Sequence, residues 1–282
     1  MRCQQCASLI NCRRRGVRVV NCLVDSQIHV GLDKYRPIEH YLPVMAAHGI
    51  EQAVLVQHGG QTDNSYLADC VRRWPDRFVA VALIDHSSPL AADEVRRIAK
   101  SGRFRGIRIP AGHRAAFGEP LAVWRAIDEA GLVATVRGPY ADIADPSFAK
   151  IVDEFPKTRF HLEHLGCYRF AADRPFAPFL ELAEKPNVFT MWSCFYEHSS
   201  LPYPHRDADP FLEQSLRAFG ADRITWSGDW NRAHLGKGDT SQDYRRAIDK
   251  ITSGLSFLTS AQLEHVRWRS ATQLYGITSL GN

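Results

Sequence analysis

The feature that most constrains the fold of this 282-residue chain is a unit that repeats from Leu23 onward. Each unit is a short apolar run, often of β-branched residues, followed by a polar loop and a stretch with apolar residues at helical spacing. The expected strands cover residues 23–30, 52–57, 77–85, 104–109, 132–137, 158–164, 187–192 and 223–229. The expected helices cover residues 37–48, 63–74, 89–100, 119–130, 145–155, 175–185, 209–219, 241–252 and 260–274.

Strands that alternate with helices pair in parallel through right-handed crossovers. Eight such units close into a barrel, so the sequence predicts an α/β fold: a single (β/α)8 TIM barrel with an extra C-terminal helix. A doubly wound open sheet is the alternative, but no Gly-x-Gly-x-x-Gly follows the first strand. Asp145 and Asp209 each precede a proline, as helix-capping residues do, and Thr259 and Gln262 have the spacing of a capping box.

The first 20 residues differ in composition from the rest of the chain. They hold five arginines and no acidic residue, which leaves 30 basic and 31 acidic residues elsewhere, although the whole chain has a formal charge of +4. We expect residues 1–20 to be a disordered Arg- and Cys-rich extension and residues 21–282 to form the barrel domain. The nearly neutral domain gives no reason to expect nucleic acid as a partner. No apolar run approaches the roughly 18 residues of a membrane span, so no membrane partner is expected either.

The seven cysteines are irregularly spaced, and their odd number argues against a disulfide framework. This pattern is typical of a reducing compartment, so we expect a cytoplasmic protein. Cys3 and Cys6 have the spacing of half a zinc site, but no second pair follows at finger-like spacing. The sequence is compatible with a homo-oligomer.

Polar residues recur at the ends of the expected strands, where the active sites of such barrels lie. Side chains alternate between the two faces of a strand, which places Asp25, Gln27 and His29 together on the first strand. The same alternation points Asp229 inward on the eighth strand. The polar ends expected to converge on one mouth are His29, Arg108, Arg137, His164 and Asp229. An aspartate beside imidazoles can deprotonate water, directly or through a metal, and two arginines can grip an anion.

Several of these residues also have a purely structural interpretation. Arg108 taken alone would more often be a salt-bridge partner, and His164 taken alone is as easily a buried core histidine. Asp25 lies deeper than His29, where a structural hydrogen-bonding role fits at least as well as a catalytic one. Trp192 is either pocket wall or core. The loop histidines that we expect to be solvated are His58, His86 and His113.

Five motifs resemble those of the amidohydrolase-related family, in the branch that holds lactonases and aromatic-acid decarboxylases. They are VDSQIHV, FRGIRIP, FHLEHLG and WSGDW on the first, fourth, sixth and eighth expected strands, and RSATQLYGI on the last helix. Together they cover about residues 23–278, in the expected order on the expected elements. The resemblance implies a metal-dependent-hydrolase type of barrel.

In that family a first-strand histidine pair, a fifth-strand histidine and the eighth-strand aspartate hold a divalent metal, commonly zinc. A sixth-strand histidine orients or polarises the substrate. By position His29, His164 and Asp229 match, whereas Gln27 and Arg137 do not. Because an amide is a weak ligand and a guanidinium cannot coordinate a cation, we predict a weakly metallated or metal-free site, with His29 and Asp229 as the remaining ligands to zinc or manganese.

The residues and the resemblance together predict a hydrolase for a small anionic molecule, a carboxylated lactone or a related ester or amide. Asp229 would be the base for the attacking water, and His164 would donate a hydrogen bond to the carbonyl. Arg108 and Arg137 would hold the substrate carboxylate or the oxyanion. The other predicted substrate-binding residues are Gln27 and Trp192.

Two other classes of function stay open. A metal-dependent non-oxidative decarboxylase of a small aromatic or unsaturated acid would use the same arginines together with a firmly bound metal. A non-catalytic barrel would bind a ligand without turnover. Metal analysis of the purified protein separates the first alternative from the hydrolase, and the Asp229→Asn variant separates the second.

Overall fold

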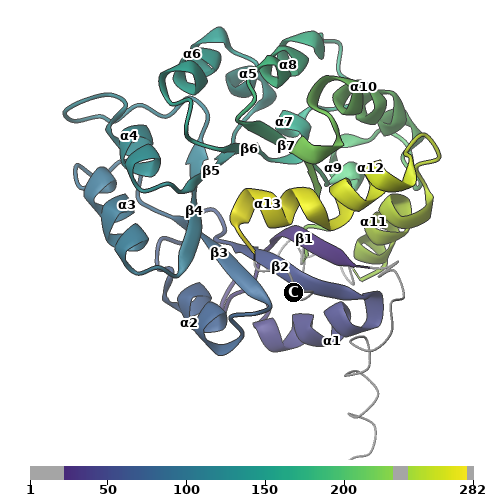
Figure 1. The fold of residues 1–282 in the computed structure, drawn as a ribbon, viewed down its shortest axis with the longest axis horizontal. Coiled ribbons are helices and arrows are strands. Elements are labelled where there is room, and N and C mark those ends of the chain that lie inside the picture. Colours follow the sequence, from purple (N-terminus) through teal and green to yellow (C-terminus); the bar gives the residue numbers. More distant parts are fainter. Residues whose placement is uncertain (1–21, 231–240, 278–282) are drawn as a thin grey trace, which may run out of the picture.

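The computed structural model describes residues 22–230 and 241–277, and its eight strands form one parallel sheet in sequential order. The strands are β1 (Leu23–Ile28), β2 (Ile50–Val56), β3 (Phe78–Leu83), β4 (Phe104–Pro110), β5 (Val133–Arg137), β6 (Phe160–Leu162), β7 (Val188–Trp192) and β8 (Ile224–Trp226). Figure 1 shows the helices around this ring of strands. The predicted (β/α)8 barrel is therefore confirmed. Residues 1–20, where we expect an extension, lie outside the described residues.

The helices of the outer layer agree with the predicted order, although several are shorter than expected. They are α1 (Ile38–His48), α2 (Ser65–Arg73), α3 (Ala91–Lys100), α4 (Ala122–Glu129), α5 (Tyr140–Ile143), α6 (Pro146–Glu154), α7 (His164–Cys167), α8 (Ala177–Glu181), α9 (Phe195–His198), α10 (Asp209–Phe219), α11 (Ser241–Ser253), α12 (Ser260–Glu264) and α13 (Ser270–Tyr275). A π-helical turn, His265–Arg269, separates α12 from α13 within the last predicted helix. Among the described residues, no helix is both long enough and apolar enough to span a membrane.

The helix caps expected from the sequence are partly confirmed. The Asp145 carboxylate accepts a hydrogen bond from the backbone of Ser147, and Thr259 and Gln262 form a capping box at α12. Asp209 does not cap α10, because it is the first residue of the helix and its carboxylate accepts a 2.7 Å hydrogen bond from Lys250 Nζ.

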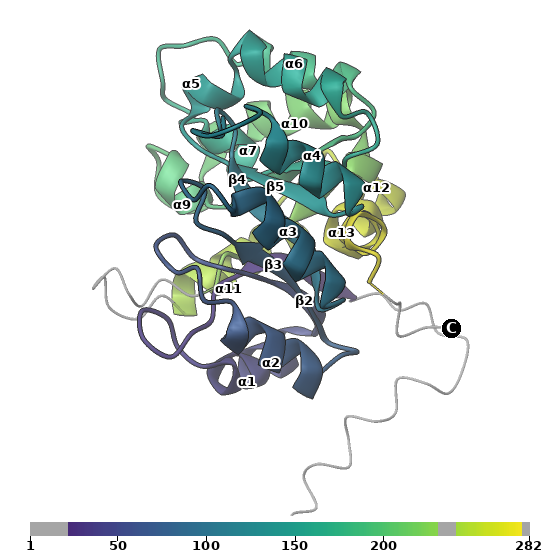
Figure 2. The ribbon, with the colours of Figure 1, turned by 90° about the vertical axis from the view of Figure 1, so that its left-hand side faces the viewer.

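Helix α13 fills the amino-terminal end of the barrel, and Figure 2 shows it on the opposite side of the strands from α9. Its Tyr275 hydroxyl lies 2.7 Å from Nδ1 of His161, whose Nε2 lies 2.8 Å from the Thr225 hydroxyl. Burial lowers the pKa of His161 to about 3, so the ring is neutral within this chain of polar contacts. The valines packed there are Val24, Val54, Val56, Val79, Val81 and Val133. Because this end is closed, a substrate must enter at the carboxyl ends of the strands.

Hydrogen bonds from side chains and loops bring the ends of β1 and β8 together. The Ser26 hydroxyl donates to the carbonyl oxygen of Trp226 at 2.7 Å, and the backbone of His29 donates to that of Trp230 at 2.6 Å. Because Asp229 directly precedes Trp230 in the chain, this bond brings His29 close to Asp229.

The predicted common face for Asp25, Gln27 and His29 is wrong for Asp25. The register of β1 against β2 shifts between Asp25 and Ile28, so the strict alternation of a strand does not hold there. The Asp25 carboxylate is fully buried and accepts a 2.8 Å hydrogen bond from the Tyr244 hydroxyl of α11, which lies in the helical layer. Asp25 thus has the structural role that was one of its two interpretations.

Candidate active site

Asp229 lies three residues beyond the end of β8, with its two carboxylate oxygens in different surroundings. Oδ2 accepts hydrogen bonds from the Cys194 thiol at 3.0 Å and from the Tyr196 hydroxyl at 3.2 Å. Oδ1 is buried and has no hydrogen-bond partner among the described residues. Burial by itself would raise the pKa of Asp229, but the nearby imidazoles of His164 and His29 and the Cys194 thiol lower the pKa below its usual range. The carboxylate is therefore ionised, with one oxygen free to accept a proton.

His29 faces that free oxygen. Its Nδ1 lies 2.6 Å from the carbonyl oxygen of Val56, which can only accept, so Nδ1 carries the proton. Burial lowers the pKa of His29 to about 4, so at neutral pH Nε2 bears a lone pair. Nε2 lies 3.6 Å from Asp229 Oδ1. Two hydrogen-bond acceptors thus face each other, and a water molecule that donates to both would fit this arrangement.

His164 follows β6 and joins the same cluster. Its Nδ1 lies 2.6 Å from the Ser193 hydroxyl, and its Nε2 lies 3.3 Å from Nε2 of Gln27 and 3.9 Å from the Cys194 sulfur. Gln27 is fully buried, and its Oε1 has no hydrogen-bond partner among the described residues. The structure therefore brings four of the predicted site residues together: Gln27, His29, His164 and Asp229.

The backbone around this cluster is strained. His164, Cys194 and Asp229 have φ values of 52°, 54° and 52°, in the left-handed region that residues with a Cβ rarely adopt. These three residues follow β6, β7 and β8. Such strain tends to gather at functional sites, where it aims side chains that a regular strand would point elsewhere.

Arg108 does not form the free anion fork that we expected. Its Nε and Nη2 each donate a 2.7 Å hydrogen bond to the Glu163 carboxylate, and its Nη1 donates to the carbonyl oxygen of Gln57 at 3.1 Å. The Glu163 side chain is 2% exposed and the Arg108 side chain 10%. Every nitrogen of this guanidinium already has a partner, which matches the salt-bridge interpretation of Arg108.

Arg137 lies at the end of β5 and is only partly buried. Among the residues that the structure describes, its guanidinium has no hydrogen bond or ion pair. A Cβ added at Gly59 would lie 3.0 Å from Arg137 Nη1, so the glycine leaves room for the guanidinium. Arg137 is therefore an arginine at this end of the barrel that can pair with an anion from solution.

Two further expectations are wrong. Trp192 is fully buried, and its indole donates a 3.0 Å hydrogen bond to Ser215 of α10, so it packs in the helical layer and does not contribute to a substrate site. The loop histidines are not solvated: His58 and His113 are buried, and the ring of His86 lies 5.1 Å from that of His113.

The sequence interpretation gave no site role to Cys194, Tyr196 or Glu163. Alternation along β6 could have identified Glu163, because it lies two residues after the inward-pointing His161. No spacing rule could have identified Cys194, since its position depends on the left-handed turn after β7.

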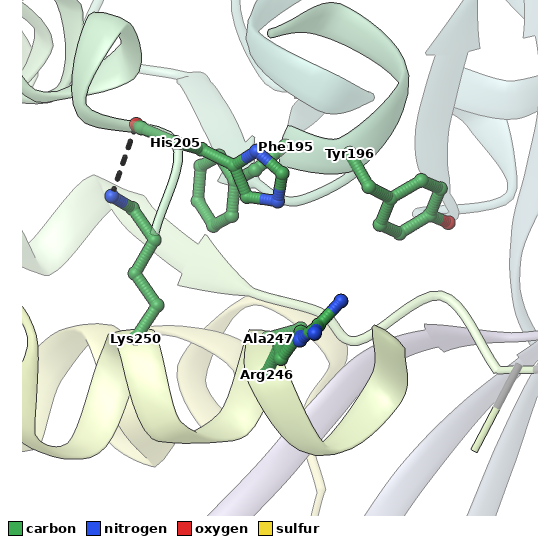
Figure 3. Close-up of a pocket in the computed structure, with 6 residues that line it drawn as sticks. All are labelled: Phe195, Tyr196, His205, Arg246, Ala247 and Lys250. Atoms are coloured by element: carbon green, nitrogen blue, oxygen red, sulfur yellow. Dashed lines mark hydrogen bonds between the residues drawn. The ribbon is translucent and has the colours of Figure 1, made fainter. Parts of the chain in front are cut away.

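A hollow beside the cluster is lined by residues of α9, α11 and the loop before α10. Figure 3 shows its lining residues: Phe195, Tyr196, His205, Arg246, Ala247 and Lys250. Lys250 donates to the carbonyl oxygen of His205 at 3.3 Å. Tyr196 connects the hollow to the cluster, because its hydroxyl bonds Asp229.

A (β/α)8 barrel with a buried carboxylate, two imidazoles and an arginine at the carboxyl ends of its strands has the form of a barrel enzyme. Residues 31–277 match the model of the amidohydrolase family. The chain belongs to that family and is a hydrolytic enzyme.

Similar proteins include one that is named as a lactonase and several solved hydrolase structures. The chain is 27% identical over 210 residues to L-fucono-1,5-lactonase of Burkholderia ambifaria, covering 68% of this chain and 69% of the lactonase. A probable 2-pyrone-4,6-dicarboxylic acid hydrolase of Acinetobacter baumannii, solved with citric acid bound, has a TM-score of 0.72 at 17% identity and covers 90% and 99% of the two chains. An amidohydrolase of Burkholderia multivorans, solved with zinc bound, has a TM-score of 0.73 at 18% identity and covers 91% and 100%.

The residues at the ligand positions of the family do not fit a divalent metal well. The positions are those of Gln27, His29, Arg137 and Asp229, and only His29 and Asp229 carry strong donor atoms. Zinc in catalytic sites takes three protein ligands of nitrogen, sulfur or carboxylate type. The positive charge of Arg137 further disfavours a cation on that side of the site.

Proposed function

We propose that this enzyme hydrolyses a small carboxylated lactone, or a related ester or amide, by water attack on the carbonyl carbon. The observation that carries the proposal is the free Oδ1 of Asp229, an ionised oxygen buried at the end of β8 with no hydrogen-bond partner among the described residues. A base of this kind accepts a proton from water as the new C–O bond forms. His29 Nε2 supplies a second acceptor that orients the same water.

The substrate is held by charge and by hydrogen bonding. Arg137 pairs with the substrate carboxylate or with the developing oxyanion, for which its guanidinium, without a partner among the described residues, is suited. His164 donates from Nε2 to the carbonyl oxygen when the Ser193 hydroxyl donates to Nδ1, an arrangement compatible with their 2.6 Å separation. Gln27, next to His164, completes this part of the substrate site. The name of the Burkholderia ambifaria relative and that of the Acinetobacter baumannii hydrolase support a lactone as the substrate class.

A panel of lactones and esters tests the proposal, each supplied with and without a carboxylate and assayed on protein purified without chelator. We expect turnover of a carboxylated lactone and a loss of about a hundredfold to ten-thousandfold in kcat for Asp229→Asn, since removal of a general base has this effect. Arg137→Met should remove the preference for the carboxylated compound. Circular dichroism of both variants controls for folding.

Three results contradict the proposal. Asp229→Asn that retains kcat within about tenfold would exclude Asp229 as the base. Release of carbon dioxide from aromatic acids, without lactone hydrolysis, would identify the decarboxylase alternative. Ligand binding without turnover of any compound would identify a non-catalytic barrel.

A further inference from the structure

Two side chains outside the family's ligand positions, together with one inside them, form a compact cluster in this site. His164, Cys194 and Asp229 each offer one ligand atom, and these atoms all lie within 4.8 Å of one another. The Cys194 sulfur lies 3.0 Å from Asp229 Oδ2 and 3.9 Å from His164 Nε2. Only Asp229 belongs to the positions that the family uses.

We propose that His164, Cys194 and Asp229 form a binding site for a thiophilic divalent cation such as zinc, displaced from the family's position toward β6 and β7. Imidazole, thiolate and carboxylate are the three ligand types that zinc takes in proteins. With metal–ligand distances of about 2.0–2.3 Å, a tetrahedral site places its ligand atoms roughly 3.5 Å apart. The two separations from the Cys194 sulfur, 3.0 Å and 3.9 Å, lie on either side of that value and need shifts of about half an ångström. The His164–Asp229 separation, which is within 4.8 Å, must shorten by up to about 1.3 Å to reach the tetrahedral spacing.

The surroundings of the ligand atoms support this site. The Nδ1 of His164 lies 2.6 Å from the Ser193 hydroxyl, the kind of contact that fixes the ring of a metal-ligating histidine. Gln27 Oε1 is buried without a partner among the described residues, and its amide nitrogen lies 3.3 Å from His164 Nε2, so rotation of the amide would turn this oxygen toward the ligand cluster. A thiolate together with a carboxylate balances the charge of a divalent cation. The thiolate also favours zinc over manganese or magnesium, which prefer oxygen ligands.

Cobalt absorption tests the site directly, because a cysteine thiolate bound to Co²⁺ gives a ligand-to-metal charge-transfer band in the near ultraviolet. We expect the full-length protein, freed of metal, to develop this band up to a single equivalent of cobalt and to lose it when zinc is added. Cys194→Ser should abolish the band, while circular dichroism shows that the variant is folded. His164→Gln should weaken cobalt binding at least tenfold.

Two control variants locate the cation. The band should persist in His29→Gln, which removes a ligand at the family's position, and in a variant with Cys3→Ser and Cys6→Ser, which removes the paired thiols near the N-terminus. Absence of a band in the wild-type protein overturns the proposal. Loss of the band in the variant with Cys3→Ser and Cys6→Ser also overturns the proposal, as does persistence of the band in Cys194→Ser.

The cation site and the proposed hydrolysis share Asp229 and His164 but can fail separately. Lactone hydrolysis by a protein that gives no cobalt band would retain the proposed function and exclude the cation site. A Cys194-dependent band in a protein that hydrolyses nothing in the panel would do the reverse.

Discussion

The ion pair between Arg108 and Glu163 gives the most demanding test of how this barrel is built. The two bonds are parallel and each is 2.7 Å long, and both side chains are almost removed from water. Burial alone would raise the pKa of Glu163, but the adjacent Arg108 guanidinium lowers it below its ordinary value, so the pair is ionised. The Glu163→Gln substitution keeps the shape of the side chain and removes its charge.

We expect Glu163→Gln to lower the free energy of unfolding by about 3–5 kcal/mol. The substitution leaves the Arg108 charge buried with only the carbonyl oxygen of Gln57 as a full partner, and an uncompensated buried charge has a cost of this size. Since domains are typically stable by roughly 5–15 kcal/mol, the loss is readily measured by urea denaturation followed by circular dichroism.

A double variant, Arg108→Met with Glu163→Leu, provides the matched comparison. Replacing both members of a buried pair by apolar side chains is often neutral or stabilising, so the double variant should be more stable than Glu163→Gln. Its KM for a carboxylated substrate should stay within about threefold of wild type, which corresponds to less than 1 kcal/mol. A Glu163→Gln variant that loses less than about 1 kcal/mol would refute the uncompensated-charge reasoning. A large rise in KM for the double variant would show that Arg108 binds substrate.

Three further predictions concern Arg137, Asp25 and the turn before Asp229. Gly59→Ala puts a Cβ 3.0 Å from Arg137 Nη1, so the guanidinium must move. The KM for the carboxylated substrate should therefore rise roughly tenfold, which corresponds to about 1.4 kcal/mol, while kcat and the free energy of unfolding stay nearly unchanged. Burial raises the pKa of Asp25 from 3.8 to about 7, so the unfolded chain releases a proton that the folded protein retains between these values. The free energy of unfolding should therefore fall by about 3 kcal/mol as pH rises from 4 to 7, and denaturation of Asp25→Asn should lack this slope. Gly228→Ala places a Cβ against the Tyr244 ring and should lower the free energy of unfolding by about 1–3 kcal/mol. Gly112→Ala, where a Cβ meets nothing within 4 Å, is the control for both glycine variants.

The barrel could be predicted because the strand pattern, the helix pattern and the residues that end each element agree along the chain. Strand and helix patterns alternate eight times, and glycine or proline marks most of the boundaries. The predicted boundaries were least accurate for β6 and β8. Each of these strands has only three residues, and the expected extensions to His164 and Asp229 belong to strained turns.

The site could be predicted only where the chain stays regular. Asp229 and His164 were identified from strand ends, and both lie in the cluster. Asp25 was misassigned because the register shift in β1 breaks the alternation on which that prediction relied. Trp192 was misassigned because every residue of β7 is buried, so the pattern of the strand could not tell the barrel interior from the helical layer.

The departures from the family's ligand pattern become physically coherent when charge is considered. A cation held by His29 and Asp229 would have one carboxylate as its sole negative ligand, and Arg137, at the end of β5, supplies no ligand atom. Cys194 adds a second negative ligand when its thiol is deprotonated, and its 3.0 Å contact with Asp229 lies on the side facing β7. A cation there would leave Asp229 Oδ1, His29 Nε2 and the guanidinium available for water and an anionic substrate. Gln27 is compatible with both the cation site and the substrate site, because its amide lies 3.3 Å from His164 and offers a hydrogen-bond donor as well as an acceptor.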